Sequence, residues 1–93
     1  CRKFVDSRKY DAVMAIGAVI RGETSHYDVV VNASTGGIAS LAAEGKVPVI
    51  LGVLTTDTVD QAMNRAGLKA GNLGCNWAST AVEMANLYKT LGK

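Results

Sequence analysis

The chain has 93 residues, of which 48% are hydrophobic and 19% are charged, and its formal net charge is +2. This length suits one small domain, and the balance of apolar and charged residues excludes a disordered chain. The low net charge and scattered basic residues give no indication of a nucleic-acid or membrane partner, and no apolar run reaches the roughly 20 residues of a membrane helix.

The first ten residues are rich in charge and predict the end of a helix followed by a turn, with Phe4 packed on a sheet. The chain opens on Cys1 without an initiator methionine, so we expect residues 1–93 to be the C-terminal part of one longer domain. No signal or transit pattern is visible. Cys1 and Cys75 lack a metal-ligand spacing and are predicted to be free thiols in a reducing compartment.

Residues 12–20 are apolar at nearly every position, which predicts a strand covered on both faces, as in a parallel sheet. The run ends at Arg21-Gly22 and the polar residues 23–26, after which apolar periodicity resumes at Tyr27. In open α/β sheets, ligands bind where a strand ends in such a loop. The loop amides and the start of the following helix favour an anion there.

Residues 27–44 are predicted to form a helix, although Val29–Val31 alone favours a strand. The reason is that two parallel strands need a crossover of a dozen or more residues, which is usually helical. Ser25 and Asp28 have the spacing of a capping box. The pair Gly36-Gly37 costs about 1 kcal/mol per residue relative to alanine, so we expect another backbone to pack closely there.

Gly45 is expected to end this helix, and residues 47–54 predict a second buried parallel strand. Thr55–Thr58 supplies N-cap candidates for a short helix over residues 59–66, closed by Gly67. These elements form one right-handed βαβ unit followed by a helix.

The last helix is predicted over residues 75–91. The face that we expect to pack carries Trp77, Ala81, Ala85, Tyr88 and Leu91. Because two strands cannot make a sheet that is buried on both faces, we expect strands before Cys1 or neighbouring subunits to complete the core.

His26 is the only histidine in the chain, and it follows the loop at the end of the first strand. It is either a surface residue in a helix cap or a neutral imidazole that accepts and returns a proton. Arg65 is either solvated or a bidentate phosphate ligand beside a turn. Glu23 and Thr24 are either capping residues or part of a phosphate loop. The residues alone predict a phosphate-bearing small ligand.

Other candidates have simpler interpretations. Trp77, Met84 and Tyr88 stand at helical spacing and are predicted to be core or interface residues. Cys75 is predicted to be a packing residue, since no histidine lies near it in the sequence. No paired-carboxylate, metal-ligand or Walker-type pattern is present, so we expect no metal.

Four segments of the chain resemble successive motifs of one enzyme family. They are GAVIRGETSHYD at residues 17–28, VPVILGVLTTDT at 47–58, QAMNRAGLKAGN at 61–72 and AVEMANL at 81–87. In this order and spacing they are similar to the 6,7-dimethyl-8-ribityllumazine synthase family of riboflavin biosynthesis. The sequence stretches TSHYD and VVNAS resemble those of plastid-type members. We therefore expect a location in the cytoplasm or, for a plant or algal protein, in the plastid stroma.

The resemblance implies a three-layer α/β/α fold with a parallel, flavodoxin-like sheet, to which this chain supplies about two strands and three helices. It implies a cofactor-free condensation of 5-amino-6-(D-ribitylamino)uracil with 3,4-dihydroxy-2-butanone 4-phosphate. The residues that it assigns to this site are His26 for proton transfer, Arg65 as the phosphate clamp, Glu23 and Thr24 in the phosphate loop, Ala18, Val19 and Ile20 in the pyrimidine pocket, and Leu51, facing the pyrimidine from the neighbouring subunit.

The resemblance further implies a homo-oligomer, a pentamer that in many members packs into an icosahedral shell of about sixty subunits, with each site between adjacent subunits. It places before Cys1 a segment, missing here, whose loops hold the ribityl-pyrimidine. Leu51 stands where many members carry an aromatic ring, and Leu73 where the family usually has lysine. A catalytically weak shell subunit and, more remotely, an unrelated phosphate-binding α/β module therefore remain alternatives to an active enzyme.

Overall fold

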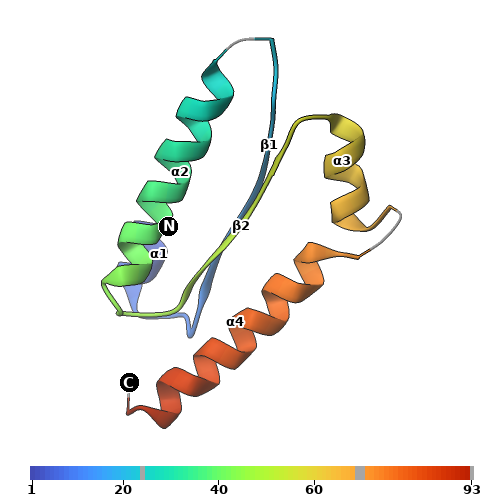
Figure 1. Ribbon diagram of the computed structural model, residues 1–93. Helices are drawn as coiled ribbons and strands as arrows, with labels where there is room; N and C mark the ends of the chain where they lie inside the picture. Colours follow the sequence, from blue (N-terminus) through green and yellow to red (C-terminus); the bar gives the residue numbers. More distant parts are fainter. Residues whose placement is uncertain (24, 69–70, 93) are drawn as a thin grey trace.

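The structure is a computed structural model that describes residues 1–23, 25–68 and 71–92. Its elements in chain order are α1 (Arg2–Ser7), β1 (Val13–Ile20), α2 (His26–Ala43), β2 (Val49–Thr56), α3 (Val59–Met63), the π-helical segment η1 (Asn64–Leu68) and α4 (Leu73–Thr90). Figure 1 shows the sheet between α2 on one side and α3 with α4 on the other. The predicted three-layer α/β/α arrangement is confirmed.

The two strands pair in parallel, with Val13 opposite Val49 and Ile20 opposite Thr56. Since α2 connects them, they form the predicted βαβ unit, and both strands end at the same edge of the sheet. β2 starts at Val49, two residues later than predicted, because Pro48 lies before the strand. The Pro48 carbonyl accepts the N–H of Val13 at 2.9 Å.

One face of the sheet carries a small core together with α1 and α2. Its buried members are Val5, Val13, Leu41, Val47 and Val49. The prediction that Phe4 packs on the sheet is wrong, because α1 turns Val5 inward to full burial and leaves Phe4 56% exposed. The Phe4 ring instead lies edge-on to Tyr10, at 5.6 Å between ring centroids.

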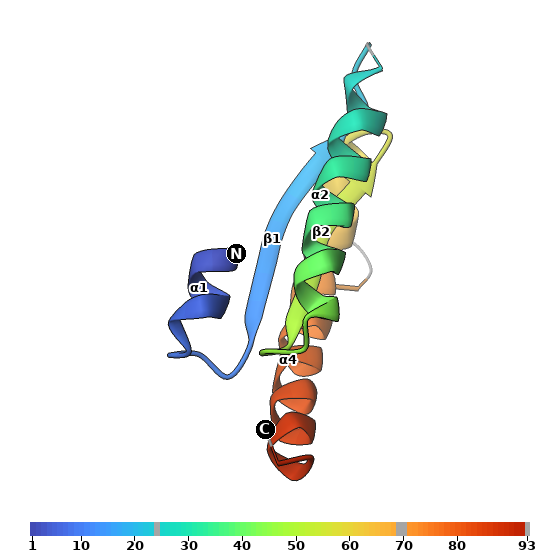
Figure 2. The same ribbon diagram turned by 90° about the vertical axis from the view of Figure 1, so that its left-hand side faces the viewer.

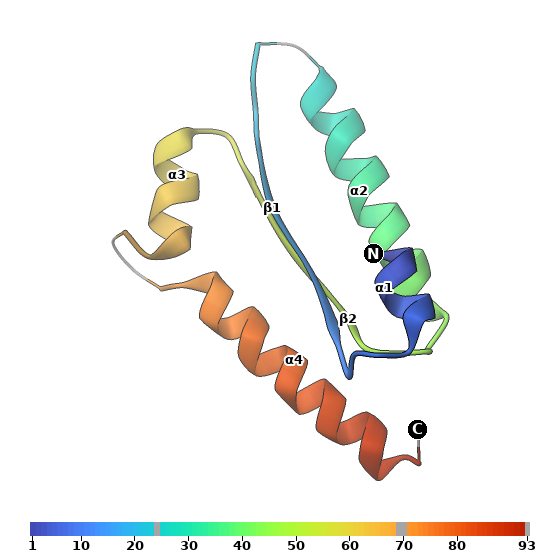
Figure 3. The ribbon, with the colours of Figure 1, turned by 180° about the vertical axis from the view of Figure 1, so that it is seen from behind.

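Two ion pairs join α1 to the turn that follows α2, and both helices lie on the same side of the sheet (Figures 2 and 3). Arg2 Nη2 is 2.8 Å from Glu44 Oε2, and Lys46 Nζ is 3.2 Å from Asp6 Oδ1. Glu44 follows the last residue of α2, and Gly45 has a φ of 72°, so it ends the helix as predicted. These contacts fix the short helix α1 against the crossover.

The start of α2 differs from the predicted capping box. Ser25 stands at the N-cap, yet its side chain makes no cap hydrogen bond. Its backbone has φ −77° and ψ 2°, whereas a capping side chain needs an extended backbone to reach back to the first turn. Around the pair Gly36-Gly37, no atom outside the helix's own turns lies within 4 Å of the position a Cβ would take. The close partner expected there is therefore not within the described part of this chain.

The opposite face of the sheet is covered by α4. Ala81 is buried, and Trp77, Ala85 and Tyr88 are half-buried on the predicted face, whereas Leu91 lies beyond the helix end and is 68% exposed. Gly52 allows this packing, because a Cβ at this position would come within 2.9 Å of the Trp77 ring.

A sheet of two strands leaves much apolar surface uncovered. In the chain by itself Ile16 is 62% exposed, and Met14 and Leu51 are each 41% exposed. The prediction that both strands are covered on both faces is therefore not met within this chain. Across the described residues, no helix combines the length and apolar character needed to cross a membrane.

Candidate functional site

The candidate site lies where β1 and β2 end. Ala18, Val19 and Ile20 are the last residues of β1, and the chain then leaves the sheet at Arg21, whose N–H donates to the Thr56 carbonyl at 2.8 Å. Because side chains alternate along a strand, Ala18 and Ile20 face the α4 layer and Val19 faces the α2 layer. Figure 1 shows that the chain turns from β1 toward α2 at this end of the sheet.

The polar loop leads directly into the long helix α2. Glu23 is exposed, and His26 is the first residue of α2 and is exposed in the chain by itself. Thr24, predicted to bind phosphate through its hydroxyl and amide, lies outside the described residues. The start of an 18-residue helix carries a partial positive charge that favours an anion, and Glu23 and His26 lie beside this helix start.

Arg21 is a residue of this region that the sequence reasoning missed. Its Nε donates to Asp57 Oδ1 at 2.8 Å, and its Nη2 lies 3.7 Å from Asp28 Oδ1. Its Cζ also lies 4.3 Å from the centroid of the Tyr27 ring. The hydrogen bond to Asp57 is the main reason that the pKa of Arg21 is raised above its ordinary value.

A signal for this contact was present in the sequence. Arg21 follows the last residue of β1, and Asp57 follows the last residue of β2, with Ile20 and Thr56 paired in the sheet. Two opposite charges directly after neighbouring parallel strands are expected to meet at one edge. The match could be seen only once the ends of both strands were known, and the second strand was predicted to end two residues too early, at Leu54 instead of Thr56.

Arg65 lies in the other layer. It is an exposed residue of η1 (Asn64–Leu68), in which Gly67 breaks the helical backbone with a φ of 126°. It borders a cavity of about 190 Å³ between the sheet and α4. The remaining residues around this cavity are Ile16, Gly17, Leu54, Ala66, Asn72, Leu73, Gly74 and Trp77. Leu73, which departs from the family pattern, therefore borders the same cavity as Arg65.

The chain thus brings together only part of the predicted site. The end of β1, the loop after it and the start of α2 carry Ala18, Val19, Ile20, Glu23 and His26. Arg65 is separated from His26 by the sheet, since α2 and η1 belong to opposite layers (Figures 1 and 3). Leu51 lies in mid-strand, paired with Ala15, and alternation places it on the α2 face.

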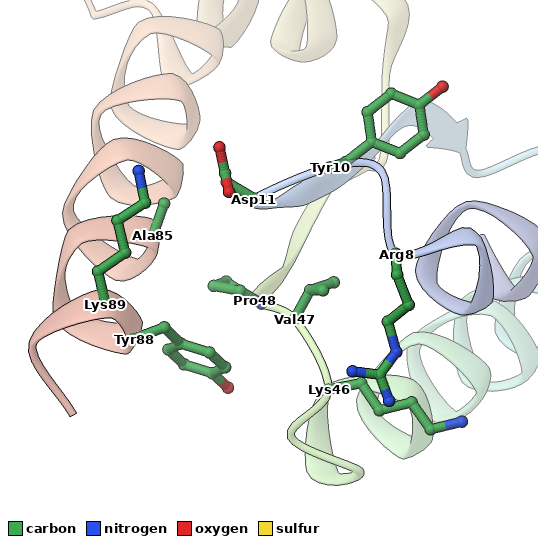
Figure 4. Close-up of a pocket in the computed structure, with 9 residues that line it drawn as sticks. All are labelled: Arg8, Tyr10, Asp11, Lys46, Val47, Pro48, Ala85, Tyr88 and Lys89. Atoms are coloured by element: carbon green, nitrogen blue, oxygen red, sulfur yellow. The ribbon is translucent and has the colours of Figure 1, made fainter. Parts of the chain in front are cut away.

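A second cavity, of about 230 Å³, lies at the opposite end of the sheet. Figure 4 shows the residues around it, which are Arg8, Tyr10, Asp11, Lys46, Val47, Pro48, Ala85, Tyr88 and Lys89. None of the predicted site residues borders it. Within the described ranges, no three His, Cys, Asp or Glu side chains are grouped so that they could hold a metal ion.

A parallel sheet with a polar loop and the start of a long helix at its carboxyl edge defines a protein of the open α/β class, in which ligands generally bind at the strand ends. A comparison with known protein families matches residues 1–89 to 6,7-dimethyl-8-ribityllumazine synthase. This match includes both strands, the helices before α4 and nearly all of α4. The chain therefore belongs to the lumazine synthase family, has its flavodoxin-like fold, and is assigned at family level to a transferase-type enzyme of riboflavin biosynthesis.

Proposed function

We propose that the protein condenses 5-amino-6-(D-ribitylamino)uracil with 3,4-dihydroxy-2-butanone 4-phosphate to 6,7-dimethyl-8-ribityllumazine. The amine of the pyrimidine attacks the ketone, and water leaves to give an imine. Inorganic phosphate is then eliminated, and ring closure releases a second water. Both substrates bring their own reactive groups, so the reaction needs no nucleophilic side chain. The family match over residues 1–89 is the observation that carries the proposal.

His26 is the proposed proton-transfer residue. Imine formation and ring closure both move protons between nitrogen and oxygen, and a positioned imidazole accelerates such steps by about 10²–10⁴-fold. Its place at the first residue of α2, after the loop at the end of β1, supports this role. The neighbouring Glu23 and Thr24 belong to the proposed phosphate loop, and Ala18, Val19 and Ile20 line the pyrimidine pocket.

Arg65 is the proposed phosphate clamp, and it acts on the loop of a neighbouring subunit. Two observations support a shared site. Arg65 and His26 lie in opposite layers of one chain, and the Arg65 side chain is exposed beside an open cavity. Leu51, 41% exposed on the α2 face, is proposed to face the pyrimidine of an adjacent subunit in the same way.

The proposed assembly is a homo-oligomer, a pentamer that packs further into an icosahedral shell. The apolar surface left on the sheet and the open positions beside Gly36-Gly37 support contacts with further copies. Closed symmetric oligomers bury such surface by repeating one interface. A site shared between subunits then forms once per interface.

The proposal is tested by measuring lumazine formation from both substrates with the wild-type protein and with Arg65→Lys. Lysine keeps the charge but loses the bidentate contact, so we expect the KM for the ketone phosphate to rise by about tenfold and the KM for the pyrimidine to stay unchanged. Arg8→Lys is the matched control, because Arg8 is an exposed arginine at the other end of the sheet. A wild-type protein that forms no lumazine would refute the proposal.

A second candidate function is a shell subunit that assembles but turns over weakly. The cavity beside Arg65 favours it, because Leu73 offers an apolar side chain where the family usually has a cation. Removing one polar contact from a binding site commonly costs about 1–3 kcal/mol. This alternative predicts normal assembly and little lumazine in the same assay.

A further inference from the structure

The side chain of Arg21 joins segments that are distant in the sequence at the edge of the candidate site. We propose that Arg21 is a positioning residue that fixes the end of β1 to the turn after β2 and so sets the amides of Gly22 and Glu23 and the start of α2 for the phosphate-bearing substrate. The role toward substrate rests on the proposed function. The positioning itself can be measured without any turnover.

The contacts of Arg21 connect the loop in two directions. Through Nε it binds Asp57, 36 residues further along the chain, at 2.8 Å. Through Nη2 it lies 3.7 Å from Asp28 in the first turn of α2, and its Cζ is 4.3 Å from the ring of Tyr27. One planar group thus bridges the turn after β2 and the first turn of α2.

The turn that carries Asp57 is itself held firmly. Thr56, only 2% exposed, donates its hydroxyl to the Thr58 carbonyl at 3.0 Å. The N–H of Asp57 donates to Gln61 Oε1 at 3.0 Å, and the N–H of Gln61 donates to Thr58 Oγ1 at 3.1 Å. These bonds close the turn onto the start of α3, so Asp57 is a fixed point from which Arg21 can position the loop.

The exposure of the cluster indicates a local role. The side chains of Arg21 and Asp57 are 47% and 64% exposed, and exposed ion pairs add little to global stability. Glu23 and His26 follow Arg21 by two and five residues. A lysine in its place would keep the charge but could not present two N–H groups in a fixed plane. The guanidinium is therefore suited to fixing the loop rather than to stabilising the whole fold.

The experiment compares Arg21→Gln, Arg21→Lys and the matched control Arg2→Gln. Arg2 makes an ion pair of the same length, 2.8 Å to Glu44, at the opposite end of α2. Amide hydrogen exchange is measured at Gly22, Glu23 and residues 25–28, and the KM of each substrate is measured in the condensation assay. We expect exchange at these amides to be faster than in the wild type in both Arg21 variants, with the larger increase in Arg21→Gln. We expect the exchange rates in Arg2→Gln to be unchanged.

In the kinetic assay we expect Arg21→Gln to raise the KM for the ketone phosphate by about tenfold and to leave the KM for the pyrimidine within about twofold. Partial unfolding would lower kcat and leave both KM values unchanged. A rise in KM for the ketone phosphate alone therefore distinguishes positioning from simple loss of fold. Unchanged exchange at the loop amides in Arg21→Gln would overturn the inference whatever the activity. If exchange is faster in the Arg21 variants but the wild-type protein makes no lumazine, the positioning role is supported and the proposed function is refuted.

Discussion

Arg2 and Arg21 make the shortest ion pairs among the described residues, each at 2.8 Å, and each joins positions more than 30 residues apart in the sequence. Arg2 ties α1 to the end of α2, and Arg21 ties the candidate loop to the turn after β2. Both pairs are partly exposed, so their main effect is on local geometry. Single residues at strand and helix ends therefore decide how the loops of this small sheet are held.

The Arg2–Glu44 pair predicts a pH dependence of stability. The hydrogen bond from Arg2 is the main reason that the pKa of Glu44 lies below its ordinary value of 4.5. Because the pKa is lowered in the folded state, the stabilisation is fully present above pH 4.5 and is lost as the pH falls through the lowered value. Because both side chains are partly exposed, the effect on global stability is small. We expect the urea midpoint of the wild type to exceed that of Glu44→Gln slightly at pH 7 and to converge with it in acid. A difference that is constant with pH would contradict this.

At the scale of elements, two helices begin with a side-chain cap from a residue type that favours this position, threonine at α3 and asparagine at α4. Thr58 caps α3 by accepting from the N–H of Gln61, and Asn72 caps α4 by accepting from the N–H of Cys75 at 3.2 Å. At α2 the cap is absent at Ser25, and the first turn is held from outside by Arg21 instead. The start of α2 therefore depends on a tertiary contact.

Thr58→Ala is expected to lower the free energy of unfolding by about 1 kcal/mol, because the N–H of Gln61 loses its acceptor at the start of α3. Thr80→Ala is the matched control. Thr80 donates to the Asn76 carbonyl within α4, and its removal leaves no helix-start N–H unsatisfied. Chemical denaturation measures both changes. Equal losses in the two variants would show that the cap has no special effect.

The order and type of the elements could be predicted because the apolar runs are continuous and the connection between parallel strands is usually helical. That rule correctly made α2 a helix across Val29–Val31. Side-chain contacts between loops could not be predicted in the same way. The Arg21–Asp57 bond depends on the register of two strands, and the burial of Val5 rather than Phe4 depends on the rotation of a helix only six residues long.

At the scale of the whole molecule, the described chain is 46 × 28 × 17 Å, a thin body built on a sheet of two strands. Its buried apolar core is small, and several large apolar side chains of the strands are exposed. The predicted site residues are divided between the two helical layers, His26 with α2 and Arg65 with η1. Both features follow if the functional unit is an assembly of copies in which neighbouring chains complete each site.

Co-expression of His26→Ala chains with Arg65→Ala chains tests this account most directly. If each site takes His26 from one chain and Arg65 from its neighbour, random assembly gives roughly a quarter of the sites both native residues. We predict that the mixed assemblies recover about that fraction of wild-type lumazine formation, although each variant alone is nearly inactive. A mixture no more active than its two parents, beside an active wild type, would contradict the account.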